Sequence, residues 1–155
     1  MVDITDILTP ASTRVGAQAQ SRKRALEVAS DLLAATYPEL SARALFDELM
    51  GRERLGSTAL GDGVAIPHCR TECDRILGAF LALDEPVDFD APDGQGVDLL
   101  FVLVVPPDEP SAHLEVLATL ARIFQSPENR RHLRNQSSDH DLYEALVGLV
   151  SSQAA

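Results

Sequence analysis

The chain has 155 residues, enough for one domain with a substantial buried core. Its hydrophobic fraction of 45% and charged fraction of 24% are typical of globular proteins and exclude a disordered or fibrous chain. Only two cysteines occur, Cys69 and Cys73, which excludes a disulfide-stabilised scaffold. The net charge of -11 makes duplex nucleic acid and anionic membranes unfavourable partners.

The N-terminus shows no sign of a targeting segment. It has neither the basic start nor the apolar stretch of a secretory signal. The longest apolar run covers only residues 99–105, whereas a membrane-spanning helix needs about 20 residues. We therefore expect a cytoplasmic protein without membrane insertion, in which both thiols stay reduced.

Hydrophobic spacing predicts alternating helices and short strands along the whole chain. The helical segments have apolar residues three or four positions apart, and the strand segments have short apolar runs. Strands are expected near residues 14–17, 64–66, 75–83 and 99–105. Helices are expected near residues 21–38, 42–50, 112–125, 127–134 and 139–149.

Turn-forming residues set several of these boundaries. Gly51 is expected to end the second helix, and Pro86 is expected to break the strand before it. Ser111 is a suitable N-cap for the helix that follows, whose wide apolar arc predicts deep burial. The alternation of elements predicts an α/β fold in which a small sheet is covered by helices. We expect a single domain over residues 1–155, with its core at about 3–149.

The segment from Arg54 to His68 has the densest set of residues suited to chemistry. It combines a guanidinium, two hydroxyls, three glycines and an imidazole within 15 residues. Gly61 and Gly63 permit positive φ, so a turn here can direct backbone N–H groups at an anion. Arg54 can bind two phosphate oxygens, and His68 follows an apolar strand, where α/β sheets place their sites. These features suit attack of a histidine nitrogen on phosphorus, although a plain turn beside a surface histidine gives the same pattern.

Two other groups of residues are candidate sites. His113 begins a predicted helix, where the helix dipole favours a neutral imidazole near a bound anion, although an exposed first-turn histidine is the plainer interpretation. His68, Cys69 and Cys73 offer three metal ligands, but a structural zinc site needs a fourth and the chain has no second pair. The Gly-Lys-Ser/Thr of a nucleotide-binding loop is also missing. We therefore expect neither metal nor cofactor.

Several segments resemble one protein family. Glu53-Arg-Leu-Gly-Ser-Thr58 followed by Gly61-Asp-Gly-Val-Ala-Ile-Pro-His68 strongly resembles the active-site segment of IIA proteins of the bacterial phosphotransferase system. The resemblance is to the fructose/mannitol type, and within it to the nitrogen-regulatory branch. It extends over residues 3–149. Further matching segments follow in the same order: Pro86-Val-Asp-Phe-Asp90, Val97-Asp-Leu-Leu-Phe-Val-Leu-Val-Val-Pro106 and His113-Leu-x-x-Leu-Ala-x-Leu-Ala121.

The resemblance implies both a fold and a reaction. The fold is an α/β domain with a mixed sheet between helices. The reaction is acceptance of a phosphoryl group from a phosphorylated HPr-like carrier on one histidine, matched by His68, without nucleotide or metal. Arg54 is taken to match the family's phosphate-binding arginine, and His113 its second active-site histidine. The sequence departs from the family at Ala59-Leu60, usually Gly-Ile or Gly-Leu, and at Cys69, often glycine.

Three functions are compatible with these features. The first is a phosphocarrier whose phosphorylation state regulates target proteins, as in the nitrogen-type branch. It is favoured because the sequence has a IIA-like region without a IIB-like or IIC-like one. The second is a sugar-transport component that passes phosphate to a fructose/mannitol-type IIB protein. The third is a binding module without phosphotransfer, against which the presence of Arg54, His68 and His113 argues.

Overall fold

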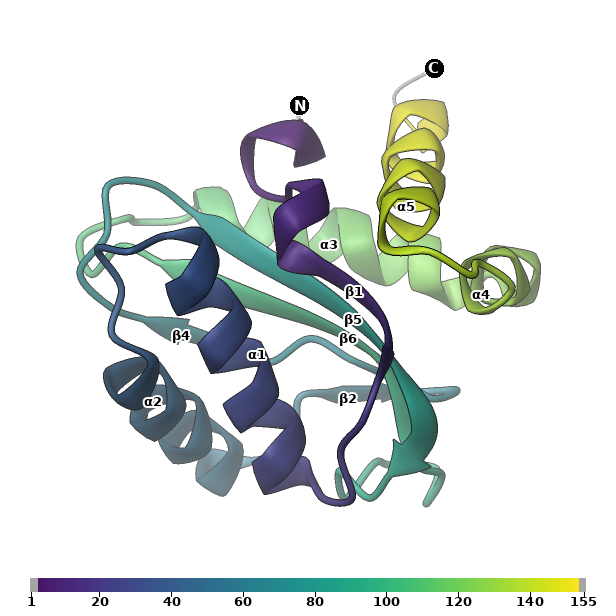
Figure 1. Cartoon of the computed structure of the whole chain (residues 1–155), viewed down its shortest axis with the longest axis horizontal. Helices are drawn as coiled ribbons and strands as arrows, with labels where there is room; N and C mark the ends of the chain where they lie inside the picture. Colours follow the sequence, from purple (N-terminus) through teal and green to yellow (C-terminus); the bar gives the residue numbers. More distant parts are fainter. Residues whose placement is uncertain (1–2, 154–155) are drawn as a thin grey trace.

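The computed structural model describes residues 3–153, which form a mixed six-stranded sheet between two layers of helices (Figure 1). The α/β class and the helix-covered sheet expected from the sequence are confirmed. The strands are β1 (Thr13–Ala17), β2 (Ala59–Gly61), β3 (Val64–Ala65), β4 (His68–Arg70), β5 (Leu77–Val87) and β6 (Val97–Val105). The helices are η1 (Ile4–Asp6), η2 (Pro10–Ser12), α1 (Arg22–Thr36), α2 (Ala42–Leu55), α3 (Ala112–Gln125), α4 (Pro127–Arg134) and α5 (Asp139–Gln153).

The sheet is organised around its central strand, β6. The strand order is β1-β5-β6-β3-β2, and β4 also pairs with β6. β5 pairs with β6 in the antiparallel sense, whereas β3 and β4 run parallel to it. β3 lies beside Leu99 and Leu100, and β4 beside the last three residues of β6, with His68 opposite Leu103. The C-terminal end of β6 therefore fixes the position of His68.

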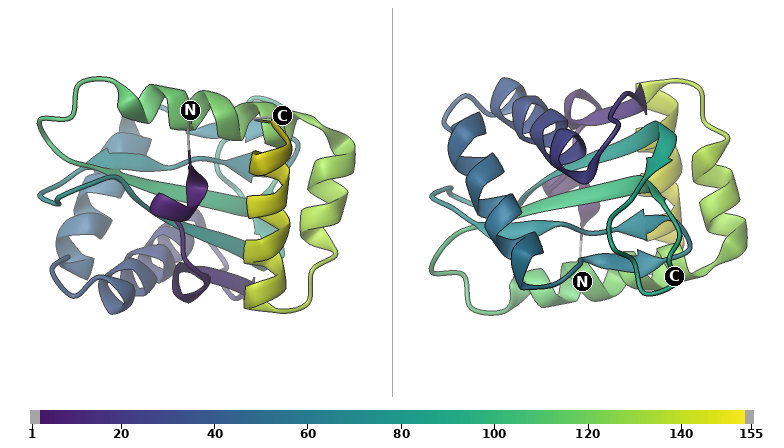
Figure 2. Two further views of the ribbon diagram at one scale, coloured as in Figure 1. Left: turned by 90° about the horizontal axis from the view of Figure 1, so that it is seen from above. Right: turned by 90° about the horizontal axis from the view of Figure 1, so that it is seen from below.

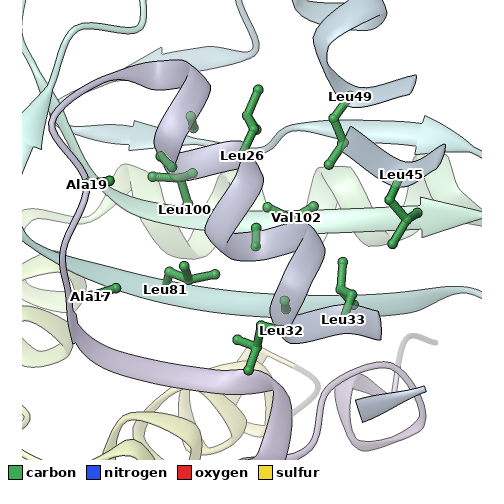
Figure 3. Close-up of a cluster of buried hydrophobic side chains, with 14 of the residues drawn as sticks. Ala17, Ala19, Leu26, Leu32, Leu33, Leu45, Leu49, Leu81, Leu100 and Val102 are labelled. Atoms are coloured by element: carbon green, nitrogen blue, oxygen red, sulfur yellow. The ribbon is translucent and has the colours of Figure 1, made fainter. Parts of the chain in front are cut away.

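Alternating side chains of β6 divide the core into two layers. Leu100, Val102 and Val104 pack with α1 and α2, whereas the odd-numbered residues from Leu99 to Val105 pack with η1, α3, α4 and α5. Figure 2 shows these two groups of helices on opposite faces of the sheet. Figure 3 shows leucines of α1 and α2 above the strand residues of the first layer. Residues 99–104 are all 0% exposed, as the continuous apolar run of this strand predicts.

The N-terminal turns complete the second layer. Ile4 and Leu8 are buried, and the backbone N–H of Gly78 donates to the carbonyl oxygen of Ile7 at 2.9 Å. A Cβ atom at Gly78 would lie 2.8 Å from the ring of Phe101, so β5 needs a glycine there. This contact brings the start of the chain onto the centre of the sheet.

The predicted end of the second helix at Gly51 is wrong. α2 continues to Leu55 and ends at Gly56, whose φ of 156° lies in the region that favours glycine. Gly51 is accommodated inside the helix, where no atom lies within 4 Å of its Cβ position. Residues 52–54 therefore belong to the last turn of a helix rather than to a loop, and they point to different sides of it.

Two further expectations need correction. Pro86 does not break its strand: β5 runs to Val87, and the pairing with β6 shifts register between Ala82 and Val87, where a missing N–H is tolerated. α3 is not deeply buried on all sides, because only its sheet-facing side is covered and Leu114 remains 56% exposed.

Within residues 3–153, no helix has the combined length and apolarity needed to cross a membrane.

Candidate functional site

A cavity of about 470 Å³ lies where α2, β4 and the start of α3 approach one another. Residues of α2, β4, the end of β6 and the start of α3 form its wall, and the two candidate histidines face the same space. The lining residues of this cavity are Asp47, Glu48, Gly51, Arg52, Leu55, His68, Cys69, Arg70, Val105 and His113.

His68 is the first residue of β4, and its ring is oriented by the backbone. Its Nδ1 lies 2.8 Å from the carbonyl oxygen of Ile66, an acceptor, so Nδ1 carries the hydrogen and Nε2 keeps a lone pair. Burial lowers the pKa of His68; the hydrogen bond to Ile66 opposes this, while the charges of Arg52 and His113 reinforce it. The ring is therefore neutral at neutral pH, which is the state that a nucleophile requires.

A buried carboxylate anchors the segment before His68. The N–H of Ile66 donates to the carbonyl oxygen of Thr58 at 3.2 Å. Thr58 in turn donates its N–H and its hydroxyl to Glu53, at 3.1 and 3.0 Å. Glu53 is only 4% exposed, and burial raises its pKa despite these hydrogen bonds. The last turn of α2 is thus linked by hydrogen bonds to Ile66, and the carbonyl of Ile66 orients the His68 ring.

His113 is held at the start of α3 by Glu109. The Nδ1 atom of His113 lies 2.8 Å from Oε2 of Glu109. The same carboxylate accepts hydrogen bonds from the backbone N–H groups of Ser111, Ala112 and His113. Burial opposes the ionisation of Glu109, but these four hydrogen bonds lower its pKa to about 2. Ser111 makes no side-chain cap, contrary to the sequence prediction, because Glu109 occupies the N–H groups that it would bind.

Arg70 connects the two histidine-bearing segments. Its Nη1 lies 2.9, 3.3 and 2.7 Å from the carbonyl oxygens of Pro106, Pro107 and Glu109. Because Arg70 and His68 share strand β4, these contacts tie the loop before α3 to the strand that carries His68. This role was not predicted, since nothing in the local sequence pattern links an arginine to carbonyl groups more than 30 residues away.

Arg52, and not Arg54, lines the cavity. Both lie in the last turn of α2, but Arg54 is exposed and outside the lining. Arg52 is half-buried, donates to the carbonyl oxygen of Gly56 at 2.9 Å and contributes to the electrostatic field at His68. Arg52 was missed because the matched motif begins at Glu53 and because residues 52–63 were expected to form a loop.

The glycine-rich turn between β2 and β3 lies outside this cavity. The backbone N–H of Asp62 donates to Asp93 at 2.8 Å, and its carbonyl accepts from Arg134 at 2.8 Å. A Cβ atom at Gly63 would collide with the guanidinium of Arg134. The φ of Gly63, 83°, lies in the left-handed region that favours glycine, and the structure does not bring this turn to the cavity that His68 lines.

Comparison with known proteins identifies the family. The model described as "Phosphoenolpyruvate-dependent sugar phosphotransferase system, EIIA 2" matches residues 6–148. The chain belongs to this family. The resemblance noted in the sequence is thereby confirmed, and the protein is a IIA component of the phosphotransferase system.

Full-length relatives place this IIA protein in the nitrogen-regulatory branch. It is 43% identical to the nitrogen regulatory protein of Pseudomonas aeruginosa, over 99% of this chain and 100% of that one. It is 40% identical to the nitrogen regulatory protein of Escherichia coli K12, over 94% and 90% of the two chains. The crystal structure of IIA-Ntr from Neisseria meningitidis superimposes with a TM-score of 0.85 at 40% identity, covering 95% of this chain and 98% of that one. The protein is a phosphocarrier of this branch.

The thiols of this IIA chain are poorly suited to chemistry. Cys69 lies beside His68, but burial raises its pKa to about 12, and the charges of Glu48 and Cys73 add to the effect. Burial also raises the pKa of Cys73, and both thiols are free. Across residues 3–153, no three histidine, cysteine or acidic side chains are grouped as metal ligands would be.

Proposed function

We propose that this protein accepts a phosphoryl group on Nε2 of His68 from a phosphorylated HPr-like carrier. The observation that carries the proposal is the state of His68: a neutral ring, with Nδ1 hydrogen-bonded to a backbone carbonyl and Nε2 free, in a cavity that also holds Arg52 and His113. A fixed tautomer removes the ambiguity over which nitrogen attacks.

The proposed step moves a phosphoryl group between two histidine nitrogens. The lone pair of His68 Nε2 forms a bond to phosphorus as the bond from phosphorus to the donor nitrogen breaks. The electron pair of the broken bond returns to the donor ring. Because one N–P bond replaces another, the exchange is close to balanced, and the protein contributes mainly alignment and charge.

The surrounding groups have separate tasks in this step. Arg52 supplies a fixed positive charge in the cavity and can bind two phosphoryl oxygens. We assign phosphate contact to Arg52 rather than to Arg54, because Arg54 is exposed outside the lining. The carbonyl of Ile66 stabilises the hydrogen on Nδ1 as the ring gains positive character. His113 hydrogen-bonds a phosphoryl oxygen.

Exposed apolar side chains on two of the helices that contribute to the cavity suit the docking of a carrier protein. Leu55 lines the cavity and is 85% exposed, and Leu114 follows His113 and is 56% exposed. Exposed leucines beside a polar site are typical of surfaces that a partner covers. The new negative charge on His68 would then alter binding of regulatory targets at the same surface.

A second candidate is onward transfer to a IIB component. It is favoured by one comparison: the fold also matches IIA-Mtl of Escherichia coli in its complex with phosphorylated IIB-Mtl, at a TM-score of 0.71 and 20% identity. The identity of the nitrogen regulatory relatives is twofold higher, which favours the regulatory role.

Phosphoryl transfer from phosphoenolpyruvate through enzyme I and the carrier tests the proposal. We expect one acid-labile phosphoryl adduct by intact mass, which is absent from His68→Ala. The matched control is His132→Ala, because His132 is an exposed histidine on α4. Full-rate phosphorylation of His68→Ala, or no adduct on the wild-type protein with an active carrier, would contradict the proposal.

A further inference from the structure

Resting on phosphorylation of His68 as proposed above, we infer that Arg70 is a positioning residue for the transfer. Its guanidinium holds residues 106–111, the loop between β6 and α3, against strand β4. This loop, named the α3 loop, carries the group that orients His113. Arg70 therefore acts through the placement of His113 beside His68, and not by contact with the phosphoryl group.

Strand β4 places Arg70 and His68 on the same face of the sheet. Alternate residues of a strand point to the same side and lie about 6.6 Å apart. Cys69, the residue between them, packs into the layer that contains α1 and α2, so His68 and Arg70 face the side on which α3 lies. Both residues line the cavity that also holds His113.

Arg70 lies at the point where the chain leaves the sheet. Its partner in the register is Val105, the last residue of β6. The backbone N–H of the next residue, Thr71, donates to the carbonyl oxygen of Val105 at 3.0 Å. Because the α3 loop begins directly after Val105, a long side chain at position 70 reaches the first turn of that loop.

The α3 loop is rich in carbonyl groups and poor in donors. Pro106, Pro107 and Pro110 have no backbone N–H. Nη1 of Arg70 lies 2.9, 3.3 and 2.7 Å from the carbonyl oxygens of Pro106, Pro107 and Glu109. Since Nη1 carries two hydrogens, at least one of them is shared between two carbonyl oxygens. One guanidinium nitrogen thus gathers the carbonyl groups of the whole turn.

Glu109 links this contact to His113. Its carbonyl oxygen accepts from Arg70, while its carboxylate accepts from the backbone N–H groups of Ser111, Ala112 and His113. Oε2 of the same carboxylate lies 2.8 Å from Nδ1 of His113. The position of the Glu109 backbone therefore determines where the first turn of α3 and the His113 ring lie.

Loss of the Arg70 contact should disturb the alignment of the site. The backbone N–H of Glu109 donates to Pro106 within the loop itself, at 3.3 Å, so this bond does not fasten the loop to the sheet. Phosphoryl transfer depends mainly on alignment, and a misplacement of about 1 Å can slow a reaction about 100-fold. We therefore expect a loss in kcat rather than in binding of the carrier.

Arg70→Met tests the inference, because methionine keeps an unbranched apolar side chain and removes the donors. Arg70→Lys restores a donor that can reach one carbonyl oxygen. The matched control is Arg75→Met, which removes an exposed arginine of the segment after β4 whose guanidinium lies over the ring of Tyr37. The concentration of phosphorylated carrier is varied to give kcat and KM, and urea unfolding shows whether each variant is folded.

We expect Arg70→Met to lower kcat by about 10–100-fold and to change KM by less than about threefold. Arg70→Lys should regain part of the lost kcat, and Arg75→Met should stay within about twofold of the wild-type protein. In the free protein, the backbone amide NMR signals of residues 109–113 should shift in Arg70→Met and not in Arg75→Met. A wild-type kcat, a loss confined to KM or unchanged amide signals in Arg70→Met would overturn the inference.

A double-mutant cycle with His113→Gln distinguishes positioning from direct contact with phosphate. If Arg70 acts through His113, adding Arg70→Met to His113→Gln should lower kcat by less than about twofold. A full effect of Arg70→Met in that background would show that Arg70 acts independently of His113, which contradicts the inference. Arg70→Lys takes the place of Arg70→Met in the cycle if the latter does not fold. Absence of any adduct on the wild-type protein would instead refute phosphorylation of His68.

Discussion

Replacement of Thr58 by valine tests whether the buried Glu53 network stabilises the fold as the structure indicates. Thr58→Val keeps the shape of the side chain and the backbone N–H but removes the hydroxyl that donates to Glu53 at 3.0 Å. Thr58 and Glu53 are 7% and 4% exposed, so water cannot readily replace that donor. A hydrogen bond to a charged group contributes about 1.5–3 kcal/mol. For a chain of this size, that loss lowers Tm by about 3–12 °C.

Urea unfolding at neutral pH measures this loss, with Thr36→Val as the control. Thr36 donates its hydroxyl to a neutral carbonyl, Leu32, within α1, and we expect Thr36→Val to cost less than about 1 kcal/mol. Burial raises the pKa of Glu53, and loss of the Thr58 donor raises it further. A group whose pKa is raised on folding stabilises the folded state at acid pH, and this stabilisation is lost as the pH rises. The difference in free energy of unfolding between the wild-type protein and Thr58→Val should therefore shrink as the pH is lowered. A deficit below about 0.5 kcal/mol at neutral pH would refute this reasoning.

Three further predictions concern the cavity, the core and the thiols. Arg52→Ala should slow phosphorylation of His68 by about 10–100-fold through loss of a charge-assisted contact, whereas Arg54→Ala should change the rate by less than about twofold in the same assay. Phe101→Ala should lower the free energy of unfolding by about 3–5 kcal/mol in urea titrations, because the residue is 0% exposed and its ring centroid lies 5.9 Å from that of Phe80. Iodoacetamide should alkylate the half-exposed Cys73 before the buried Cys69, as peptide mass mapping over time would show; faster labelling of Cys69 would contradict its burial.

Elements with strong local signals were predictable from the sequence. The helix from Ala112 to Gln125 has the expected bounds, because Ser111 and Ser126 flank a long apolar pattern. β6 was recognisable from an apolar run that needs cover on both faces. β2 and β4 were not expected, because strands of three residues acquire their form from pairing rather than from their own pattern.

The candidate site was predictable only for residues that belong to a recognisable sequence motif and also lie at the end of a predicted strand or the start of a predicted helix. His68 and His113 were both selected from the sequence, and the structure places them on one cavity. Arg52 was not selected because Gly51 was expected to end the helix before it. Helical periodicity, which places Arg52 and Arg54 on different sides of α2, could therefore not be used to choose between them. Glu109 was not selected from the sequence although its partners, residues 111–113, lie only two to four positions further along, because the cap of this helix was assigned to Ser111.

The three-residue strand β4 has a consequence for how the protein responds to fluctuations. It carries His68 and Arg70, and within the described part of the chain its strand partner is β6 alone. Cys69 is the only residue of β4 in either hydrophobic layer, and the pairing of β5 with β6 does not involve β4. A brief detachment of β4 would therefore dismantle the phosphoryl acceptor while most of the molecule stays folded. The rate at which the backbone amides of this strand exchange with deuterium would then report how often β4 opens and His68 leaves its position as phosphoryl acceptor.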